Sequence, residues 1–244
     1  MTFTALSGGT LRLPLAIHLR VAILSLFLFC ANFTLFYYGA FNLSSGLLAV
    51  VFSTASLMVL TIKSAIDREW PQLQLMIAVV FGILGVGLIF LPELENGHAP
   101  LISLALCFGG TLIFSLGNIL SGRLQSKNIS VISANSWGML YGSAFLAMIS
   151  FMRGHSFIIE PTWKYLGGLA WLSTISSVIA FTCYLTLVGR IGPGRASYIT
   201  VIFPVLALLI SQRAEAFEWT IFAIFGLILV IAGNTLMARS VPRQ

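Results

Sequence analysis

The sequence has little charge of either sign. Charged residues make up only 8% of its 244 residues, and Asp and Glu together number 7. A soluble domain carries about 25% charged residues. Hydrophobic residues instead make up 58% of this chain, and the mean hydropathy is +1.00. This composition excludes an ordinary soluble protein and predicts a protein embedded in a membrane.

Grouped cysteines and histidines are also missing. We interpret the three cysteines, which lie far apart in apolar stretches, as small buried side chains: Cys30, Cys107 and Cys183. The three histidines fall in predicted loops: His18, His98 and His155. No metal cluster, phosphate-binding loop or Ser/His/Asp set can be assembled from residues so scattered. The sequence therefore predicts no cofactor, no metal site and no catalytic residues.

Long apolar runs dominate the chain instead. About 20 apolar residues in a helix cross a hydrocarbon layer about 30 Å thick, and eight such runs contain no Asp, Glu, His, Lys or Arg. Runs this long and continuous are typical of helices, not of the alternating strands of outer-membrane barrels. We therefore predict an all-α fold, a polytopic membrane helix bundle with eight transmembrane helices at 21–40, 46–62, 73–91, 100–120, 131–152, 165–188, 196–212 and 219–238.

Lysine and arginine are distributed unevenly between the predicted loops. With the N-terminus in the cytoplasm, ten of the 13 basic residues lie inside, and only Arg153, Lys164 and Arg213 lie outside. Because basic residues accumulate on the cytoplasmic side, we expect a multi-pass protein of the inner membrane with both termini in the cytoplasm. The net charge of +6 then follows from topology and requires no nucleic-acid partner.

The chain contains an internal repeat. A shift of 148 positions aligns residues 19–92 with 167–240 without a gap, and 11 of the 74 aligned pairs are identical. The edges of the predicted spans and their tight turns also coincide. Because equivalent spans are five apart, the two copies cross the membrane in opposite directions, which is the inverted repeat of secondary transporters. The pairs that coincide include Gly46 with Gly194, Asp67 with Glu215, and Gly85 with Gly233.

The two copies are not equally complete. The second copy also includes spans 100–120 and 131–152, for which the first copy has no counterparts, so the chain holds three plus five helices of an expected five plus five. We therefore predict a cytoplasmic segment at 1–18, an incomplete first repeat at 19–95 and a second repeat at 98–240. Ser56 stands where the second copy has Pro204, which predicts that only the second copy has a helix-breaking feature.

The stretch FTCYLTLVGRIGPGRASYITVIFPVLALLISQRAEAFEWTIFAIFGLILVIAGN at 181–234 resembles the last three helices of the EamA-type permeases in the drug/metabolite transporter superfamily. The shared features are an aromatic-rich helix, a short Gly/Pro turn, a small-residue helix with a central proline and an acidic end, and a final helix with spaced glycines. The resemblance covers residues 15–240. It implies a ten-helix fold with both termini in the cytoplasm that moves small metabolites or drugs, here without the first two helices.

Polar residues form a stripe along the predicted span 100–120. Their spacings of eight, four and three keep them on about a third of the helix circumference, so the stripe should not face lipid. A substrate path and hydrogen bonding between helices explain it equally well. The same two interpretations apply to Asn32, an amide well inside the first span. The stripe consists of Ser103, Thr111, Ser115 and Asn118.

Aromatic and hydroxyl residues complete the set of cavity candidates. Trp137 and Tyr141 are one turn apart and can stack on a ring or a cation, although aromatic packing is the simpler interpretation. Ser177 and Tyr184 repeat the polar pattern more weakly in the sixth span. Tyr198 lies in the seventh span.

Thr200 and Pro204 share the seventh span with Tyr198. Pro204 frees a carbonyl near Thr200 that can bind substrate or allow a kink, and we favour the kink. Asp67 and Glu215 lie at equivalent positions at the edges of the membrane. They can form gating ion pairs with neighbouring arginines, but we favour the interpretation that they are solvated loop charges.

A permease working by alternating access agrees best with these features. The spans contain no carboxylate or histidine for a proton relay and no Lys or Arg for a strongly anionic substrate, so we expect a neutral, zwitterionic or weakly cationic substrate. The expected partners are this small molecule and the lipid bilayer, and a homodimer is also considered. Two alternatives stay open: a truncated or non-functional permease remnant, and a membrane-embedded enzyme, which is disfavoured because the spans supply no catalytic set.

Overall fold

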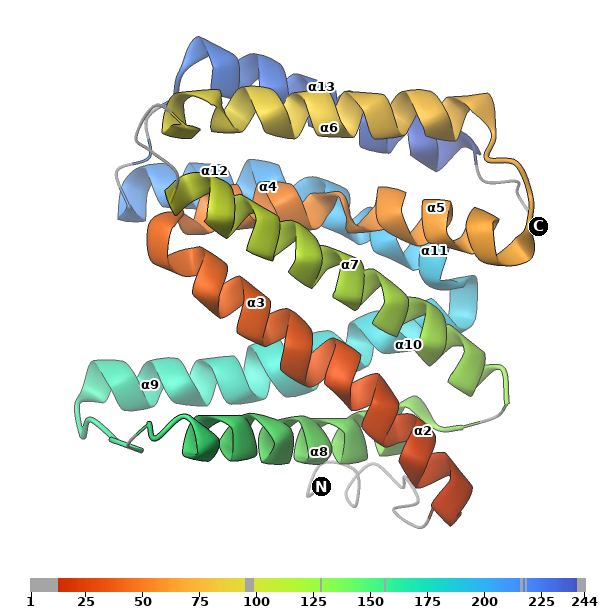
Figure 1. Ribbon diagram of the computed structural model, residues 1–244, viewed down its shortest axis with the longest axis vertical. Helices are drawn as coiled ribbons and strands as arrows, with labels where there is room; N and C mark the ends of the chain where they lie inside the picture. Colours follow the sequence, from red (N-terminus) through yellow and green to blue (C-terminus); the bar gives the residue numbers. More distant parts are fainter. Residues whose placement is uncertain are drawn as a thin grey trace. The chain divides into compact units, whose positions relative to one another are not determined.

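The computed structural model describes residues 13–94, 99–127, 129–155, 157–215, 217 and 219–240, with the backbone alone at 93–94, 99–100, 197–198, 201 and 238–240. Every regular element in this part of the chain is helical, as the all-α prediction requires (Figure 1). The elements are α2 (Leu15–Ser25), η1 (Leu26–Ala31), α3 (Asn32–Gly39), η2 (Ala40–Asn42), α4 (Ser45–Ser53), α5 (Ala55–Asp67), α6 (Leu73–Leu94), α7 (Ala99–Gln125), α8 (Val131–Met152), α9 (Trp163–Trp171), η3 (Leu172–Ala180), α10 (Phe181–Ile191), α11 (Pro193–Ala196), η4 (Ser197–Ile202), α12 (Phe203–Ala214) and α13 (Ile221–Ser240).

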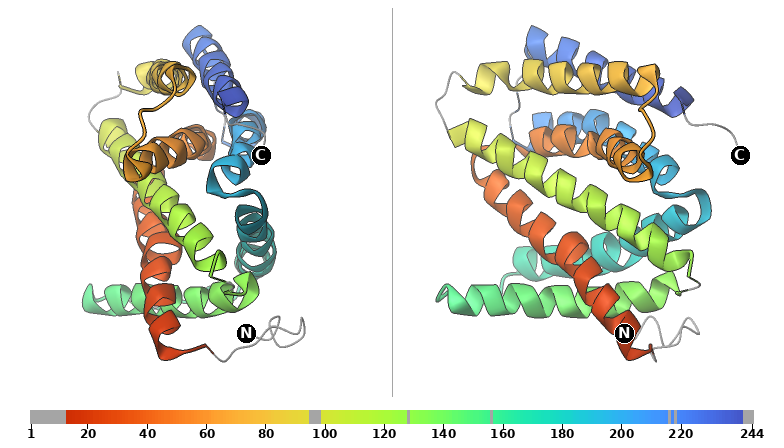
Figure 2. Two further views of the ribbon diagram at one scale, coloured as in Figure 1. Left: turned by 90° about the vertical axis from the view of Figure 1, so that its right-hand side faces the viewer. Right: turned by 45° about the vertical axis from the view of Figure 1, so that its right-hand side comes forward.

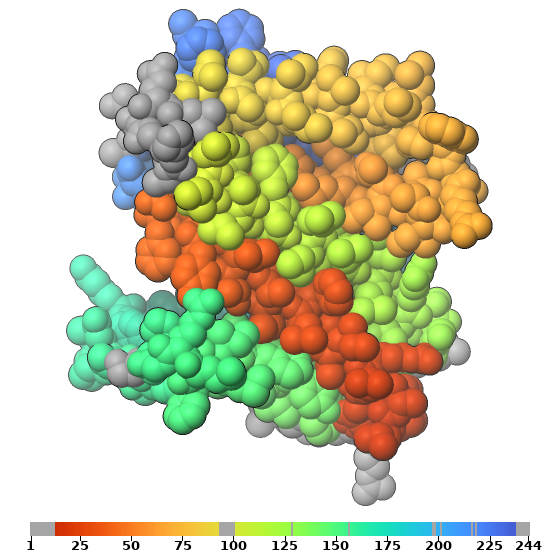
Figure 3. Space-filling model, viewed as in Figure 1, coloured from red at the N-terminus to blue at the C-terminus, as the bar shows by residue number. Residues whose placement is uncertain are grey.

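The helices are those of a polytopic membrane protein. Each of the eight predicted spans corresponds to one helix or to a run of consecutive helices, and α8 has the predicted bounds. The α6 segment lies at the surface seen in Figure 3. It carries exposed apolar side chains such as Leu73, Val80 and Ile83, as expected for a surface that lies in lipid. Among the described residues, five segments are both long and apolar enough to cross a membrane: Leu15–Asn42, Ser45–Asp67, Leu73–Pro92, Leu101–Gln125 and Trp163–Ile191.

The chain divides into two compact units, each built from two stretches of sequence. Unit 1 contains Met1–Cys30 and Leu120–Gly192, and unit 2 contains Ala31–Ile119 and Pro193–Gln244. Each unit therefore combines residues from both predicted repeats.

Unit 1 is held together by α8, which packs against α2 and α10. Two glycines of α8 let η1, which continues α2, approach closely, because a Cβ at Gly138 or Gly142 would lie only 3.0 or 2.5 Å from side-chain atoms of Phe29. The ring of Phe29 in turn contacts Phe181, with centroids 5.2 Å apart. Small residues at helix interfaces let backbones approach closely in membrane proteins.

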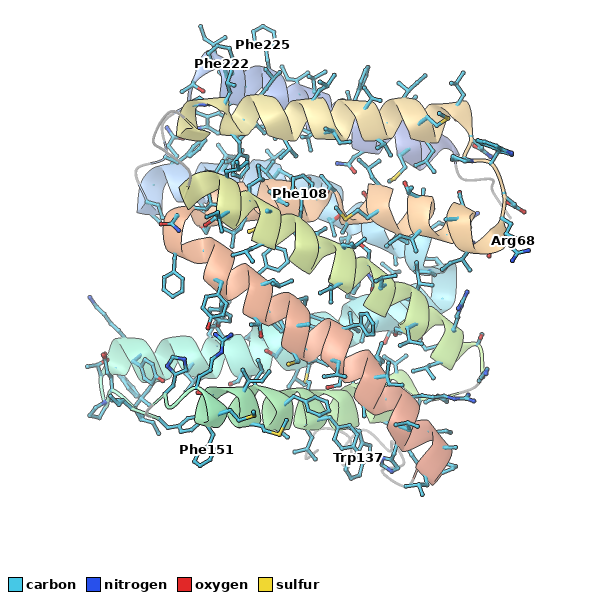
Figure 4. The ribbon with its side chains drawn as sticks, in the orientation of Figure 1. Arg68, Phe108, Trp137, Phe151, Phe222 and Phe225 are labelled. Atoms are coloured by element: carbon cyan, nitrogen blue, oxygen red, sulfur yellow. The ribbon has the colours of Figure 1, made fainter. Side chains whose placement is uncertain are left out.

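Unit 2 is built on two antiparallel helix pairs. The helices α6 and α13 lie side by side along their length (Figures 1 and 2), and α4 packs against α12. Phe222 and Phe225 project from α13 to the outside (Figure 4). Between the two pairs lies the apolar core of this unit, which consists of Leu43, Leu47, Val50, Val51, Val86, Ile89, Phe90, Cys107, Leu208 and Val230.

Contacts in unit 2 are reciprocal across the internal repeat. A Cβ at Gly46 would lie 2.9 Å from the Leu208 side chain, and a Cβ at Gly194 would lie 2.6 Å from the Leu60 side chain. Gly194 and Leu208 are the residues 148 positions after Gly46 and Leu60. Gly46 thus contacts the equivalent of Leu60, and Leu60 contacts the equivalent of Gly46. Such reciprocal contacts are the rule for surfaces related by a twofold axis.

The α6–α13 pair obeys the same rule. A Cβ at Gly85 would lie 2.6 Å from the carbonyl oxygen of Gly226, and one at Gly233 would lie 2.8 Å from the carbonyl oxygen of Ala78. Gly233 and Gly226 stand 148 positions after Gly85 and Ala78. The alignment of the two copies therefore corresponds to physical pairing of their equivalent helices.

The copies also share an irregularity. The π-helix η1 covers residues 26–31, whose equivalents at 174–179 lie inside the second π-helix, η3. π-helical turns leave the regular hydrogen-bond ladder of an α-helix and are common at functional sites. Conservation of this feature between two copies with few identical residues indicates that it belongs to the architecture.

We predict that Gly85→Ala destabilises the protein, because the added methyl group would force α6 away from the Gly226 carbonyl. Overpacking of this kind costs about 1–3 kcal/mol, or a Tm lower by about 2–12 °C. Gly87→Ala is the matched control, since a Cβ there meets nothing within 4 Å and alanine favours the helix. Thermal unfolding in detergent measures both variants, and equal Tm values for the two would contradict the packing described.

Candidate functional site

The second predicted span breaks in its middle, between α4 and α5. Helix α4 ends at Ser53, α5 begins at Ala55, and Thr54 stands between them. The backbone tightens here, because Thr54 N donates to the Val51 carbonyl three residues earlier, at 3.0 Å. Two hydroxyls add bonds to the same turn: Ser53 Oγ donates to the Val50 carbonyl at 2.7 Å, and Thr54 Oγ1 donates to the Val51 carbonyl at 2.6 Å. Hydroxyls that bond to carbonyls of the preceding turn bend helices, so this break forms without a proline.

This break corrects the prediction that only the second copy has a helix-breaking feature. The equivalent of Thr54 is Ile202, the last residue of the 3-10 helix η4 before α12 begins. Pro204 cannot donate to the carbonyl of Thr200, but Phe203 N donates to that carbonyl instead. Both copies are thus interrupted at the same place by a bond to the carbonyl three residues earlier, with added hydroxyl bonds in the first copy and a proline in the second.

Buried polar side chains connect the first break to neighbouring helices. Ser56 Oγ donates to Asn234 Oδ1 of α13 at 2.7 Å, and Asn234 Nδ2 donates to the Val230 carbonyl at 3.0 Å. On α7, Ser115 Oγ lies 2.8 Å from the Thr111 carbonyl and 3.3 Å from the Ala55 carbonyl. The side chains of Ser56, Ser115 and Asn234 are fully buried, so the break is a polar region inside an apolar unit.

Phenyl rings lie beside the hydroxyls and amides. The ring of Phe52, two residues before the first break, lies 4.7 Å from the ring of Phe114 and 5.7 Å from that of Phe36. It also stacks on Phe203, the first residue after the second break, at 6.4 Å and 8°. A few polar groups set among aromatic side chains are typical of sites for small molecules. We therefore take the paired breaks as the candidate functional site.

The polar stripe predicted on α7 faces the interior of the protein. All four of its residues are fully buried. Thr111 Oγ1 donates to the Cys107 carbonyl at 2.8 Å, and Ser103 Oγ accepts from Asn42 Nδ2 at 3.2 Å. Ser115 reaches the break itself, through the Ala55 carbonyl. Asn32 is also buried, and its Oδ1 has no hydrogen-bond partner among the described residues.

Other predicted residues belong to unit 1. Trp137 (Figure 4) and Tyr141 stack with ring centroids 5.7 Å apart. His18 contacts both side chains. Its Nδ1 lies 2.7 Å from Tyr141 Oη, and its ring centroid lies 4.7 Å from that of Trp137. The prediction that His18 lies in a loop is wrong, because α2 begins at Leu15 and extends the first apolar helix toward the N-terminus.

The remaining predicted residues are dispersed. Ser177 Oγ donates to the Leu172 carbonyl within η3 at 2.8 Å, and Tyr184 is half-buried on α10. The side chain of Tyr198 lies outside the described residues. The predicted candidates therefore divide between the units: Trp137, Tyr141, Ser177 and Tyr184 in unit 1, and Asn32, Ser103, Thr111, Ser115, Asn118, Tyr198, Thr200 and Pro204 in unit 2.

Sequence reasoning missed several polar contacts. The run Phe52-Ser-Thr-Ala-Ser56 in the middle of a span was the available sign of the first break. In unit 1, Asn135 Nδ2 donates to Thr182 Oγ1 at 3.0 Å and joins α8 to α10. One cysteine was also misjudged, since Cys183 is exposed. Among the described residues, no group of three or more His, Cys, Asp or Glu side chains is placed to hold a metal ion.

Glu215 is more than a solvated loop charge, although its side chain is exposed. Its Oε2 accepts from Ser45 N at 2.8 Å and from Ser211 Oγ at 2.7 Å. Desolvation raises the pKa of this carboxyl, but the hydrogen bonds from Ser211 and Ser45 lower the pKa by more than desolvation raises it. The pKa therefore lies below its ordinary value. The carboxylate is thus held in its charged form at the first residue of α4.

We predict a pH dependence of stability from Glu215. A carboxyl whose pKa is lower in the folded state stabilises the protein above the unfolded pKa, and this contribution is lost as pH falls through the folded pKa. The Tm of the native chain should therefore fall more between pH 6 and pH 3 than that of Glu215→Gln. Asp67→Asn, at the equivalent position of the first copy, is the control. If the Tm of the native chain and that of Glu215→Gln fell in parallel with pH, Glu215 would not make this contribution to stability.

Paired, interrupted helices from two copies of one repeat are typical of membrane transporters, many of which build their sites from discontinuous helices. Comparison with known families agrees. The EamA-like transporter family matches residues 101–239, more than half of the chain. The chain belongs to the EamA-like transporter family.

Individual proteins give the same result. The chain is 26% identical to the "Uncharacterized transporter YoaV" of Bacillus subtilis over 197 residues, covering 80% of this chain and 67% of YoaV. It is 23% identical to the "Protein PagO" of Salmonella typhimurium over 242 residues, covering 96% and 77%. A solved structure described as the crystal structure of a protein aligns with 96% of this chain and 80% of its own, with a TM-score of 0.70 and 14% identity, which shows a shared fold.

Proposed function

We propose that this membrane transporter is a permease that moves small neutral, zwitterionic or weakly cationic molecules by alternating access. The observation that carries this proposal is the pair of helix breaks at Thr54 and Ile202, which occur at equivalent positions of the two copies. Interrupted helices at a repeat interface are where secondary transporters bind their substrates. The proposed location is the inner membrane with both termini in the cytoplasm, and a homodimer is part of the same proposal.

The side chains at the breaks support this substrate class. Ser56, Ser115 and Asn234 offer hydroxyl and amide groups, which donate and accept hydrogen bonds but carry no charge. Phe52 and Phe203 offer ring faces that bind apolar surface or a cation. None of these side chains can neutralise a phosphate or a dicarboxylate, and burying such an anion without a counter-charge is costly. A strongly anionic substrate is therefore disfavoured.

The reciprocal contacts support alternating access. Gly46 of α4 contacts Leu208 of α12 at one end of the paired second and seventh spans, and Gly194 of α11 contacts Leu60 of α5 at the other. Similar packing at both ends allows one end to separate while the other closes, with little net change in contact area. Such an exchange around a fixed centre is the movement of inverted-repeat transporters.

We predict that the purified protein in liposomes exchanges a labelled substrate against the same unlabelled substrate trapped inside. The panel should contain neutral, zwitterionic and weakly cationic metabolites, with a sugar phosphate as the anionic comparison. At least one member of the first three groups should enter above protein-free liposomes, and the sugar phosphate should not. The transport proposal fails if no compound enters above that background.

Once a substrate is known, we predict that Asn234→Leu reduces its exchange at least tenfold, because this change removes the amide that bonds Ser56 at the break. Thr235→Val is the matched control, since Thr235 is the next residue on α13, is exposed, and bonds only to the Ile231 carbonyl among the described residues. Both variants must elute as single species in detergent. If both variants exchanged substrate at the same rate, the helix breaks would have no part in transport.

A further inference from the structure

The second span, α4 and α5, lies against the seventh span, α11, η4 and α12, and the two ends of this span pair are held differently. At one end, the Glu215 carboxylate, which directly follows α12, accepts a hydrogen bond from Ser45 N, the first residue of α4, at 2.8 Å. Ser211 Oγ on α12 donates to the same carboxylate oxygen at 2.7 Å and fixes its position. A Cβ at Gly46 would lie 3.0 Å from Ser211 Cβ, so the helices are in close contact where the carboxylate joins them.

Helix α4 depends on this carboxylate because it has no cap of its own. The N-cap residue, Ser44, makes no side-chain capping bond. The first N–H groups of a helix have no partner within the helix, and a negative charge there is also favoured by the helix dipole. Glu215 is therefore the N-terminal cap of α4, supplied from a residue 170 positions away.

The internal repeat shows that the other end cannot be held in this way. The equivalents of Glu215 and Ser45 are Asp67 and Pro193. Proline has no N–H to donate, so Asp67 has no matching bond to form at the first residue of α11. The packing contact is nevertheless retained at this end, because Gly194 still contacts Leu60. The two copies agree in packing and differ in the cap.

We propose that Glu215 and Ser45 form a latch that keeps their end of the span pair, where α4 meets α12, closed in the substrate-free protein, while the other end, where α5 meets α11, opens more readily. This inference rests on the proposed alternating access and specifies which residues set its resting state. The positive-inside distribution of Lys and Arg places Glu215 outside. The permease would then rest closed to the outside and open to the cytoplasm.

The test uses single cysteines at the two equivalent contact positions, Leu208 and Leu60. They are introduced into a chain whose three native cysteines are replaced by alanine, and labelled by a soluble maleimide in unsealed membrane fragments, where both faces are reachable. Leu208 is fully buried in the structure, so its cysteine reacts only when the latched end separates. No substrate is needed, so the readout does not depend on transport.

We predict that Ser45→Pro raises the labelling rate at position 208 by about 2- to 10-fold, the range expected for loss of a charged helix cap, without raising it at position 60. Proline is tolerated in the first turn of a helix, so this variant removes the N–H and keeps the fold. Glu215→Ala should have the same effect and serves as the second test if Ser45→Pro is not recovered as a single species. Asp67→Ala is the matched control and should change neither rate.

The latch is refuted if Ser45→Pro and Glu215→Ala label at position 208 as slowly as the parent, or if Asp67→Ala speeds labelling equally. If the protein exchanges substrate in liposomes but neither variant changes the labelling rates, the latch is refuted and the transport proposal stands. Faster labelling at position 208 in a protein that exchanges nothing would support the latch and refute the transport proposal.

Discussion

The constraint on which the rest of the structure depends is that backbone polar groups inside a membrane must find partners within the protein. A break in a transmembrane helix releases such groups, so it persists only where side chains or shorter backbone bonds replace them. In the first copy, Thr54 N bonds to the Val51 carbonyl and the hydroxyls of Ser53 and Thr54 add further bonds. In the second copy, Phe203 N makes the corresponding bond to the Thr200 carbonyl. The breaks are consequently buried in unit 2, next to Ser115 and other polar side chains that also need partners.

Symmetry between the copies explains where these breaks lie and how they pack. Glycines bring equivalent helices into backbone contact, and the contact from Gly85 to Gly226 recurs as that from Gly233 to Ala78. The capping bond of Glu215 is a point at which the symmetry of the packed ends fails, because a proline stands where the other copy has a donor. Alternating access needs two nearly equivalent arrangements and a bias between them. In the proposed latch, the packing of the copies supplies the first and the bonds to Glu215 supply the second.

The sequence predicted the fold well where hydrophobicity alone decides it. The α8 helix has the predicted bounds because its apolar run is interrupted only at Arg153, and the offset of 148 positions identified helices that do pair. The first break was not predictable in the same way, since Ser53 and Thr54 can also sit in a straight helix with their hydroxyls bonded to the preceding turn. The bonds from Glu215 to Ser45 and from Ser56 to Asn234 join residues more than 160 positions apart, and no local pattern reports them.

The central claim is that the two ends of the paired helices open in alternation around the breaks. Distances between spin labels test it most directly, with one pair at Leu48 and Gln212 near the latched end and another at Ser64 and Ile199 near the opposite end. When a transported substrate is added, one distance should lengthen while the other shortens. Distances that both stay fixed, or that lengthen together, would contradict the account.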